Sequence, residues 1–157
     1  GVVKIIDFGI AKAIQNSNTT NIVRDCIVGT LNYLAPEAIT GNGKHKLGRA
    51  SDIWSLGCIL YQLVYGHPPF HSYTNLYEKL AAIPNERVAI PYPPIVLPPG
   101  INPVVADQLL DVMKRCLVRD PRERIGLPEL LAHPFLDGCG PTKLDDLLVV
   151  DSANGSV

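Results

Sequence analysis

The 157-residue sequence predicts a mainly α-helical protein with very little β-strand, on three observations. An apolar helical pattern covers residues 51–66, and an amphipathic helical pattern follows residue 102. The clearest strand pattern is the short run Val2–Ile6. The 46% hydrophobic content is ordinary for a globular domain and too high for a disordered tail. The length fits one domain with a sizeable core, or part of a larger domain.

The composition also excludes several classes of protein. With 14 Lys and Arg against 15 Asp and Glu, the net charge of −1 lacks the basic excess of proteins that bind nucleic acids or acidic membranes. No apolar run is long enough to span a bilayer, and no basic leader with a cleavage site opens the chain. The four cysteines lie far apart, which argues against a structural zinc site and favours reduced thiols in an intracellular protein. Because the first residue is Gly rather than Met, we expect a piece of a longer protein.

The N-terminal part of the chain is expected to hold one strand, a long loop and a short helical turn. Val2–Ile6 is expected to be a buried strand, closed by a turn at Asp7-Phe8-Gly9. Residues 10–34 show no sustained period, and so long an irregular loop is uncommon in a compact domain unless it is functional. Ala35-Pro36-Glu37 then opens a short helical turn.

The central helix is expected over about residues 51–66. Ser51 can cap its N-terminus, and Asp52 in the first turn is favourable at the positive end of the helix dipole. Apolar residues cover nearly every face, and Gly66 with Pro68 gives a C-terminal stop. A helix that is apolar all round should be buried all round, so we expect it at the centre of a helical domain.

Three further helices are predicted, separated by a proline-rich stretch. The first lies near residues 74–83. Residues 91–103 are best interpreted as an extended connection, with a polyproline II ligand as the alternative. Asn102 as cap and Pro103 at the first helical position start the next helix. A short last helix is expected within residues 126–133.

Several short motifs occur in a fixed order along the chain. They are Asp7-Phe8-Gly9, Gly29-Thr30, Ala35-Pro36-Glu37, Ser51-Asp52-Ile53-Trp54-Ser55-Leu56-Gly57, Pro68-Pro69-Phe70, Asp120-Pro121-Arg122-Glu123-Arg124 and His133-Pro134-Phe135. Each is weak alone, but together they resemble the second half of a protein kinase domain, from the magnesium-binding strand to the end of the large lobe. The resemblance covers residues 1–136 and leaves residues 137–157 as a tail that we expect to be flexible.

The resemblance is closest to the monopolar-spindle family of dual-specificity kinases, which act in the spindle checkpoint. It is carried by Asp7-Phe8-Gly9-Ile10-Ala11, Gly29-Thr30-Leu31-Asn32-Tyr33, Gly57-Cys58-Ile59-Leu60-Tyr61, Tyr65-Gly66 and Leu130-Leu131-Ala132-His133-Pro134. It implies transfer of the γ-phosphate of ATP to serine and threonine of protein substrates and, by dual specificity, to tyrosine. It also implies a location in the nucleus at kinetochores, with the cytoplasm as the alternative.

The resemblance assigns the nucleotide and metal site to the start of the chain. Magnesium is usually held by one or two carboxylates plus substrate phosphates, which suits Asp7 at the end of a strand. Ile6 would line the nucleotide pocket, Phe8 would be the packing residue of the switch, and Gly9 completes the motif. The alternative for Asp7 is the start of an ordinary turn. For Ile6 it is a residue of the strand core, and for Phe8 a core aromatic.

Residues 7–37 would then be the activation segment. Phosphorylation adds about two negative charges, which can order such a loop by pairing with Arg or Lys. Ser17, Thr19 and Thr20 are candidate sites, with an unmodified solvated loop as the alternative. Thr30 resembles the threonine beside the catalytic base and is also a candidate phosphorylation site; its alternative is a turn threonine after a glycine.

The resemblance also implies roles for four structural residues. Glu37 and Arg124 would tie the end of the activation segment to the last helices. Asp52 would hold the catalytic loop from below, with dipole stabilisation as the alternative. Trp54 belongs to the core in either interpretation.

The sequence lacks the Gly-rich loop, the strand Lys with its helix Glu, and the H-R-D-x-x-x-x-N motif of a working kinase. Because all of these precede the D-F-G motif, we expect a truncation at the N-terminus. Two classes follow: part of a kinase, or a shortened non-catalytic helical module that binds partners. We predict an inactive isolated chain that self-associates, since helices from the missing part would cover one side of the central helix.

Overall fold

The computed structural model describes residues 31–40 and 48–139, and the structural statements below refer to these residues. The helical elements, in chain order, are η2 (Leu31–Tyr33), α1 (Pro36–Thr40), α2 (Arg49–Tyr65), α3 (Leu76–Ala82), α4 (Val104–Cys116), α5 (Leu127–Leu131) and η3 (Pro134–Cys139). No strand occurs within the described ranges, so the mainly α-helical prediction is confirmed. The predicted strand Val2–Ile6 lies outside them.

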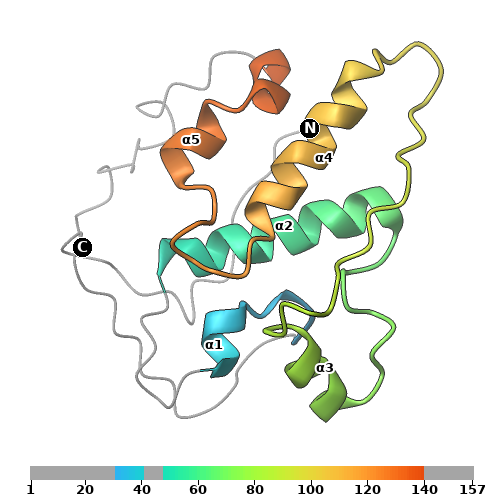
Figure 1. Ribbon diagram of the computed structural model, residues 1–157. Coiled ribbons are helices and arrows are strands. Elements are labelled where there is room, and N and C mark those ends of the chain that lie inside the picture. The colour runs from blue at the N-terminus through green and yellow to red at the C-terminus, as the bar shows by residue number, and fades with distance from the viewer. Residues whose placement is uncertain (1–30, 41–47, 140–157) are drawn as a thin grey trace, which may run out of the picture.

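Helix α2 forms the centre of the described fold (Figure 1). Helix α4 crosses it obliquely, and these two helices make the most extensive helix–helix contact. Helix α5 lies beside α4, whereas α1 and α3 lie on the other side of α2 (Figure 1). The extended segment between α3 and α4 runs along the outer edge of the molecule.

Only the C-terminal end of α2 lies where the sequence predicts it. Gly66 has φ +79° and its N–H donates to the Gln62 carbonyl at 2.8 Å, so it ends the helix as predicted. The predicted start at Ser51 is wrong, because α2 begins at Arg49 after an extended Gly48 and no side chain caps it. The hydroxyl of Ser51 is engaged elsewhere, by a carboxylate of α1 described below.

The core is built where α2 and α4 cross. Trp54, Cys58 and Tyr61 of α2 are buried, as are Met113 and Cys116 of α4. Gly57 allows this close approach: a Cβ at this position would lie 2.7 Å from the Cβ of Cys116. The crossing therefore requires a residue without a side chain.

One face of α2 is not buried, although the sequence predicts burial all round. Leu56 is 46% exposed, Ile59 47% and Leu63 78%. These residues are spaced by three and four positions and therefore lie on one side of the helix. The prediction that α2 is buried all round is therefore wrong for this face.

Asparagine side chains accept backbone hydrogen bonds at the start of the next two helices. Asn75 Oδ1 accepts hydrogen bonds from the backbone N–H of Tyr77 at 2.8 Å and of Glu78 at 3.4 Å. Asn102 Oδ1 accepts from the N–H of Val104 at 3.0 Å, but α4 begins at Val104 with Pro103 as its N-cap, one residue later than the sequence predicts. The predicted helices therefore form, with ends that differ from expectation by one or two residues.

His133 connects α4 to the C-terminal end of the described fold. It is 3% exposed, and its Nε2 lies 2.9 Å from Asp111 Oδ2 on α4. The N–H of Phe135 donates to His133 Nδ1 at 3.2 Å, which holds the start of η3. The motif His133-Pro134-Phe135 thus has a structural use in the described fold.

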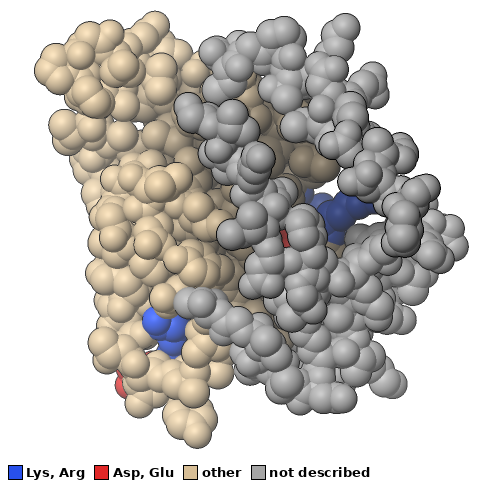
Figure 2. Space-filling model, turned by 180° about the vertical axis from the view of Figure 1, so that it is seen from behind, with Lys and Arg blue, Asp and Glu red and all other residues tan. Residues whose placement is uncertain are grey.

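The surface carries few charged side chains on the side seen from behind, within the described part (Figure 2). None of the helices within residues 31–40 and 48–139 has the length and apolar character needed to cross a membrane.

Candidate functional site

The described part of the candidate site is the segment 31–40 and the helices that hold it. The predicted nucleotide, metal and phosphorylation residues are Ile6, Asp7, Phe8, Gly9, Ser17, Thr19, Thr20 and Thr30, and they lie outside the described residues. Glu37, Asp52, Trp54 and Arg124 lie inside them.

An ion pair joins Glu37 to Arg124 across 87 residues of sequence. Nη1 of Arg124 donates to Glu37 Oε1 at 2.8 Å, and Nη2 donates to Oε2 at 2.9 Å. The side chain of Arg124 is fully buried and that of Glu37 is 13% exposed. This bidentate geometry is the strong form of an Arg–carboxylate interaction.

The remaining polar groups of the pair are also satisfied. Nε of Arg124 donates to the carbonyl of Val118 at 2.8 Å, and Nη2 also donates to that of Arg119 at 3.1 Å. Ser51 Oγ donates to Glu37 Oε1 at 2.8 Å. The pair therefore connects α1, α2 and the loop after α4 in one hydrogen-bonded group.

The electrostatics favour an ionised Glu37. Burial alone would raise the pKa of its carboxyl, but the hydrogen bond from Arg124 and further hydrogen bonds, including that from Ser51, together with the positive charge of Arg124, outweigh burial. The pKa of Glu37 is therefore below its ordinary value.

Trp54 supports the pair from within the core. Its side chain is 1% exposed, and the guanidinium carbon of Arg124 lies 5.2 Å from its ring centroid. Contacts of this kind attract a cation to the ring face. Trp54 is thus a core residue that also positions Arg124.

Three further hydrogen bonds fix the residues that directly follow Thr30. The hydroxyl of Tyr33 donates to Gln62 Oε1 at 2.6 Å, and Ser55 Oγ donates to the Tyr33 carbonyl at 2.9 Å. Lys79 Nζ donates to Asn32 Oδ1 at 2.6 Å. Segment 31–33 is therefore held by α2 from one side and by α3 from another.

Sequence reasoning missed these tethers. Gln62 gave the one usable signal, because it is the only strongly polar residue in the middle of an apolar helix. A polar group at such a position requires a partner. The identity of that partner, Tyr33, follows only from the fold.

Asp52 lies in the first turn of α2, where its charge is favourable to the helix dipole. Its side chain is exposed, yet the surrounding protein desolvates the carboxyl enough to raise its pKa. Within the described residues, no hydrogen bond to this carboxylate is present. Asp52 is thus a desolvated acceptor without a described donor.

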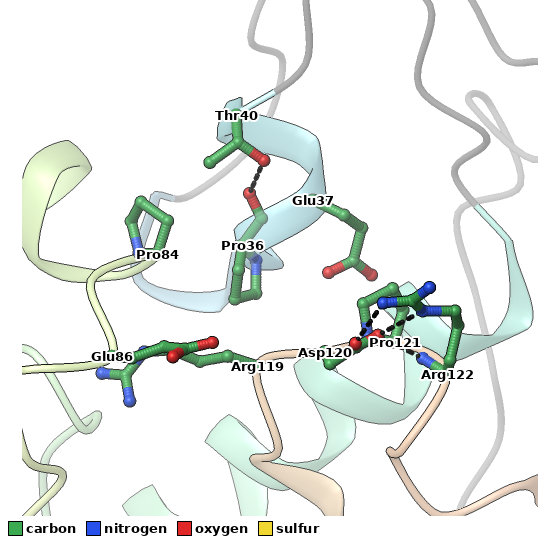
Figure 3. A pocket seen from close by; sticks show the side chains of 9 residues that line it. All are labelled: Pro36, Glu37, Thr40, Pro84, Glu86, Arg119, Asp120, Pro121 and Arg122. Carbon is green, nitrogen blue, oxygen red and sulfur yellow. Dashed lines mark hydrogen bonds and ion pairs between the residues drawn. The ribbon is translucent and has the colours of Figure 1, made fainter.

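A pocket of about 380 Å³ opens beside Glu37 (Figure 3). It is formed by α1, the residues after α3 and the loop after α4, and its lining residues are Pro36, Glu37, Thr40, Pro84, Glu86, Arg119, Asp120, Pro121 and Arg122. The guanidinium of Arg122 is occupied by Asp120, to which Nη2 donates at 2.6 Å. Arg119 Nε donates to the carbonyl of Ile83 at 2.8 Å. The two arginines that line the pocket are thus both engaged in structural contacts.

The described residues contain no group of three or more His, Cys, Asp or Glu side chains that could hold a metal ion. The predicted magnesium ligand is Asp7, outside them. What the described arrangement does is hold the segment 31–40 in place through the contacts given above.

Similarity to known proteins identifies the segment that Glu37 and Arg124 hold in place. The sequence model of the protein kinase domain family matches residues 1–136. This chain belongs to the protein kinase family. The segment clamped by Glu37 and Arg124 is therefore the part of a kinase domain that follows the D-F-G motif.

Similar proteins include kinases of the Mps1 and TTK group. The chain is 52% identical to the serine/threonine-protein kinase mph1 of Schizosaccharomyces pombe, over 87% of this chain. It is 51% identical to the probable serine/threonine-protein kinase mps1 of Dictyostelium discoideum, and 48% identical to the dual specificity protein kinase Ttk of Danio rerio, each over 87% of this chain. The resemblance to monopolar-spindle kinases is thus confirmed. The matched part spans 22%, 14% and 13% of these three relatives.

Proposed function

We propose that this chain is part of a protein kinase that transfers the γ-phosphate of ATP to serine and threonine of protein substrates, with tyrosine as a further acceptor. The observation that carries the proposal is the buried Glu37–Arg124 pair. It anchors the C-terminal end of the segment 7–37, which begins at the D-F-G motif and contains Thr30.

Phosphoryl transfer explains why such an anchor is useful. The reaction needs little covalent chemistry from the protein and depends on placement and on neutralising phosphate charge. Asp7 would hold Mg²⁺ against the phosphates, and Ile6 would line the nucleotide pocket. Thr30 would lie beside the catalytic base, directly before the tethered segment 31–33. A clamp that fixes this segment would keep Thr30 and the substrate in register.

The same segment is proposed to be regulated by phosphorylation at Ser17, Thr19, Thr20 or Thr30. Phosphate on this loop would pair with Arg or Lys and order it. A fixed end at Glu37 supports this proposal, because a loop with one anchored end loses less entropy when it is ordered.

Asp52 is proposed to hold the catalytic loop from below. An aspartate with a raised pKa and no donor among the described residues would gain from a backbone N–H supplied by that loop. The exposed face of Leu56, Ile59 and Leu63 would pack against the same missing elements.

The cellular role is proposed from the resemblance to monopolar-spindle kinases. We propose that the whole protein acts in the mitotic spindle checkpoint and is located at kinetochores in the nucleus. Its support is the 52%, 51% and 48% identity to kinases of the mph1, mps1 and Ttk kind.

Phosphotransfer by two forms of the protein tests the proposal. The isolated 157-residue chain with Mg²⁺-ATP and a generic protein acceptor should transfer no phosphate, since it lacks the catalytic base. The longer endogenous polypeptide, identified by an intact mass well above 17.0 kDa, should transfer phosphate.

Asp7→Asn in the longer polypeptide should reduce that transfer about 100-fold or more. Arg122→Ala, an exposed position in the D-P-R-E-R motif, serves as the control and should leave activity unchanged. An endogenous protein without phosphotransfer, or with activity indifferent to Asp7→Asn, would contradict the proposal and favour the non-catalytic module. Turnover by the isolated chain that depends on Asp7 would overturn its predicted inactivity.

A further inference from the structure

The connection between α3 and α4 is unusual in composition. Residues 88–106 contain no Asp, Glu, Lys, Arg or His. The prolines Pro91, Pro93, Pro94, Pro98 and Pro99 are all exposed. The segment forms neither helix nor strand from residue 90 to residue 98 and follows the outer edge of the molecule (Figure 1).

Covalent geometry restricts residues 90–94 to an extended form. Proline fixes φ near −65°, and a residue that precedes a proline is pushed to the β and polyproline II region. Ile90, Tyr92 and Pro93 each precede a proline, and three of the residues 91–94 are prolines. The run Pro91-Tyr92-Pro93-Pro94 therefore favours a polyproline II helix and has the PxxP spacing.

Two tyrosines of α2 hold this run on the body of the protein. The hydroxyl of Tyr61 donates to the carbonyl of Pro91 at 2.7 Å, and the hydroxyl of Tyr65 donates to that of Pro93 at 2.9 Å. The ring of Tyr92 packs on Tyr61 with centroids 5.9 Å apart. The carbonyls of Ile90 and Tyr92 accept no hydrogen bond from a described residue.

Exposure along the run follows a period of three residues. Tyr92 and Ile95 are half-buried and pack against the core. Pro91 and Pro94 are exposed, and so are Pro93 and Val96, the latter at 91%. Since a polyproline II helix has three residues per turn, one edge is fixed to the protein and the two other edges face solvent.

We propose that residues 91–96 are a docking segment for a domain that binds polyproline II helices in an aromatic-lined groove, of the SH3, WW or EVH1 kind. Such grooves recognise PxxP segments and exploit their preformed, low-entropy conformation. Here the edge that contains Tyr92 fixes the segment to the protein. The edge of Pro91 and Pro94 and the edge of Pro93 and Val96 face solvent, where a partner domain could bind them. The interaction is independent of phosphotransfer.

The anchoring should add to affinity. A free proline-rich peptide loses conformational freedom when it binds, whereas this run is already held by two hydrogen bonds and a packed aromatic ring. The absence of charge in residues 88–106 means that recognition would depend on packing against the proline rings rather than on ion pairs.

An array of purified SH3, WW and EVH1 domains tests the proposal, with the folded 157-residue chain as the probe. We expect at least one domain to bind. Pro91→Ala combined with Pro94→Ala should weaken that binding at least about tenfold, which corresponds to about 1.4 kcal/mol. This pair keeps both carbonyls, including the one that Tyr61 binds. The matched control is Pro98→Ala combined with Pro99→Ala, which removes two exposed prolines outside the proposed segment.

Two further variants separate docking from folding. Val96→Asp changes a side chain that is 91% exposed and should weaken binding without changing the far-UV circular dichroism spectrum. Tyr65→Phe removes one anchor and should weaken binding by less than the double proline variant. No bound domain, or a domain that binds the Pro91/Pro94 variant as tightly as the unmodified chain, would overturn the proposal.

Discussion

Arg124 is the residue on which the hydrogen bonds around Glu37 converge. Its guanidinium is fully buried and pairs with both oxygens of Glu37. Breaking a buried pair by removing one partner is costly, because the other charge remains buried without compensation. We expect Glu37→Gln to lower the free energy of unfolding by about 3–5 kcal/mol, measured by urea denaturation.

The control for this prediction is the pair formed by Arg122 and Asp120. Nη2 of Arg122 donates to Asp120 Oδ2 at 2.6 Å, but its side chain is 87% exposed. Exposed pairs contribute about 0–1 kcal/mol, so Arg122→Ala should change stability little. If Glu37→Gln costs no more than Arg122→Ala, the buried pair is not an anchor.

Acid should remove the contribution of Glu37. Its pKa in the folded state is below its usual value of 4.5, so its stabilisation is complete above that pH and is lost as the pH falls through the folded pKa. The difference in stability between the unmodified chain and Glu37→Gln should therefore shrink below about pH 4.5. Thermal unfolding between pH 3 and pH 7 measures this, and a difference that grows in acid would contradict it.

Asp52 should show the opposite dependence. Desolvation raises the pKa of this carboxyl above its usual value of 3.8, so the ionised form opposes folding at neutral pH and the penalty disappears as the pH falls through the folded pKa. Asp52→Asn should stabilise the isolated chain at pH 7, by less than about 1 kcal/mol because the side chain is exposed and screened. The gain should vanish near pH 3. A loss of stability at pH 7 would instead favour a role limited to the helix dipole.

Gly57 allows the close packing of helices α2 and α4. Alanine favours a helix over glycine by about 1 kcal/mol, yet its Cβ would lie 2.7 Å from the Cβ of Cys116 and 3.0 Å from Leu117 Cδ2. Overpacking costs about 1–3 kcal/mol, so the clash should win. We expect Gly57→Ala to lower the urea midpoint, whereas Leu63→Ala, at a site that is 78% exposed on the same helix, should not.

Local patterns along the chain predict its helices well but not the partners of their ends. Gly66 acts through its own backbone and Asn102 binds the N–H two residues on, so the stop could be predicted, and the start of α4 to within one residue. Ser51 also has the chemistry of a cap, but Glu37 is within reach in the fold and takes its hydroxyl. Competition between a local and a distant partner cannot be decided without the tertiary arrangement.

The candidate site divides in the same way. Glu37 and Arg124 are 87 residues apart, so spacing carries no information on their contact and only the family resemblance implied it. The tether from Lys79 to Asn32 joins residues 47 positions apart and belongs to no motif. Such contacts follow from how α3 packs beside segment 31–33, which the sequence pattern does not specify.

The exposed face of α2 governs the behaviour of the whole molecule in solution. Leu56, Ile59 and Leu63 form an apolar stripe on the central helix of the described fold, and burying each fully would contribute about 1.5–3 kcal/mol. A continuous apolar surface of this kind favours association. We expect the isolated chain to form oligomers whose size increases with concentration, measured by size-exclusion chromatography with light scattering.

Replacing the three residues of this stripe by Gln should restore a monomer with little loss of stability, since none of them is buried. Tyr77→Gln is the matched control, because Tyr77 is 81% exposed on α3 and lies outside the stripe. If the unmodified chain is monomeric and unfolds in one sharp transition, the stripe is compatible with an independent domain. If the Tyr77 variant dissociates the oligomer as well as the triple variant does, association uses another surface. Dissociation by the triple variant alone would locate it on the face of α2 that, in the proposed kinase, packs against the missing elements.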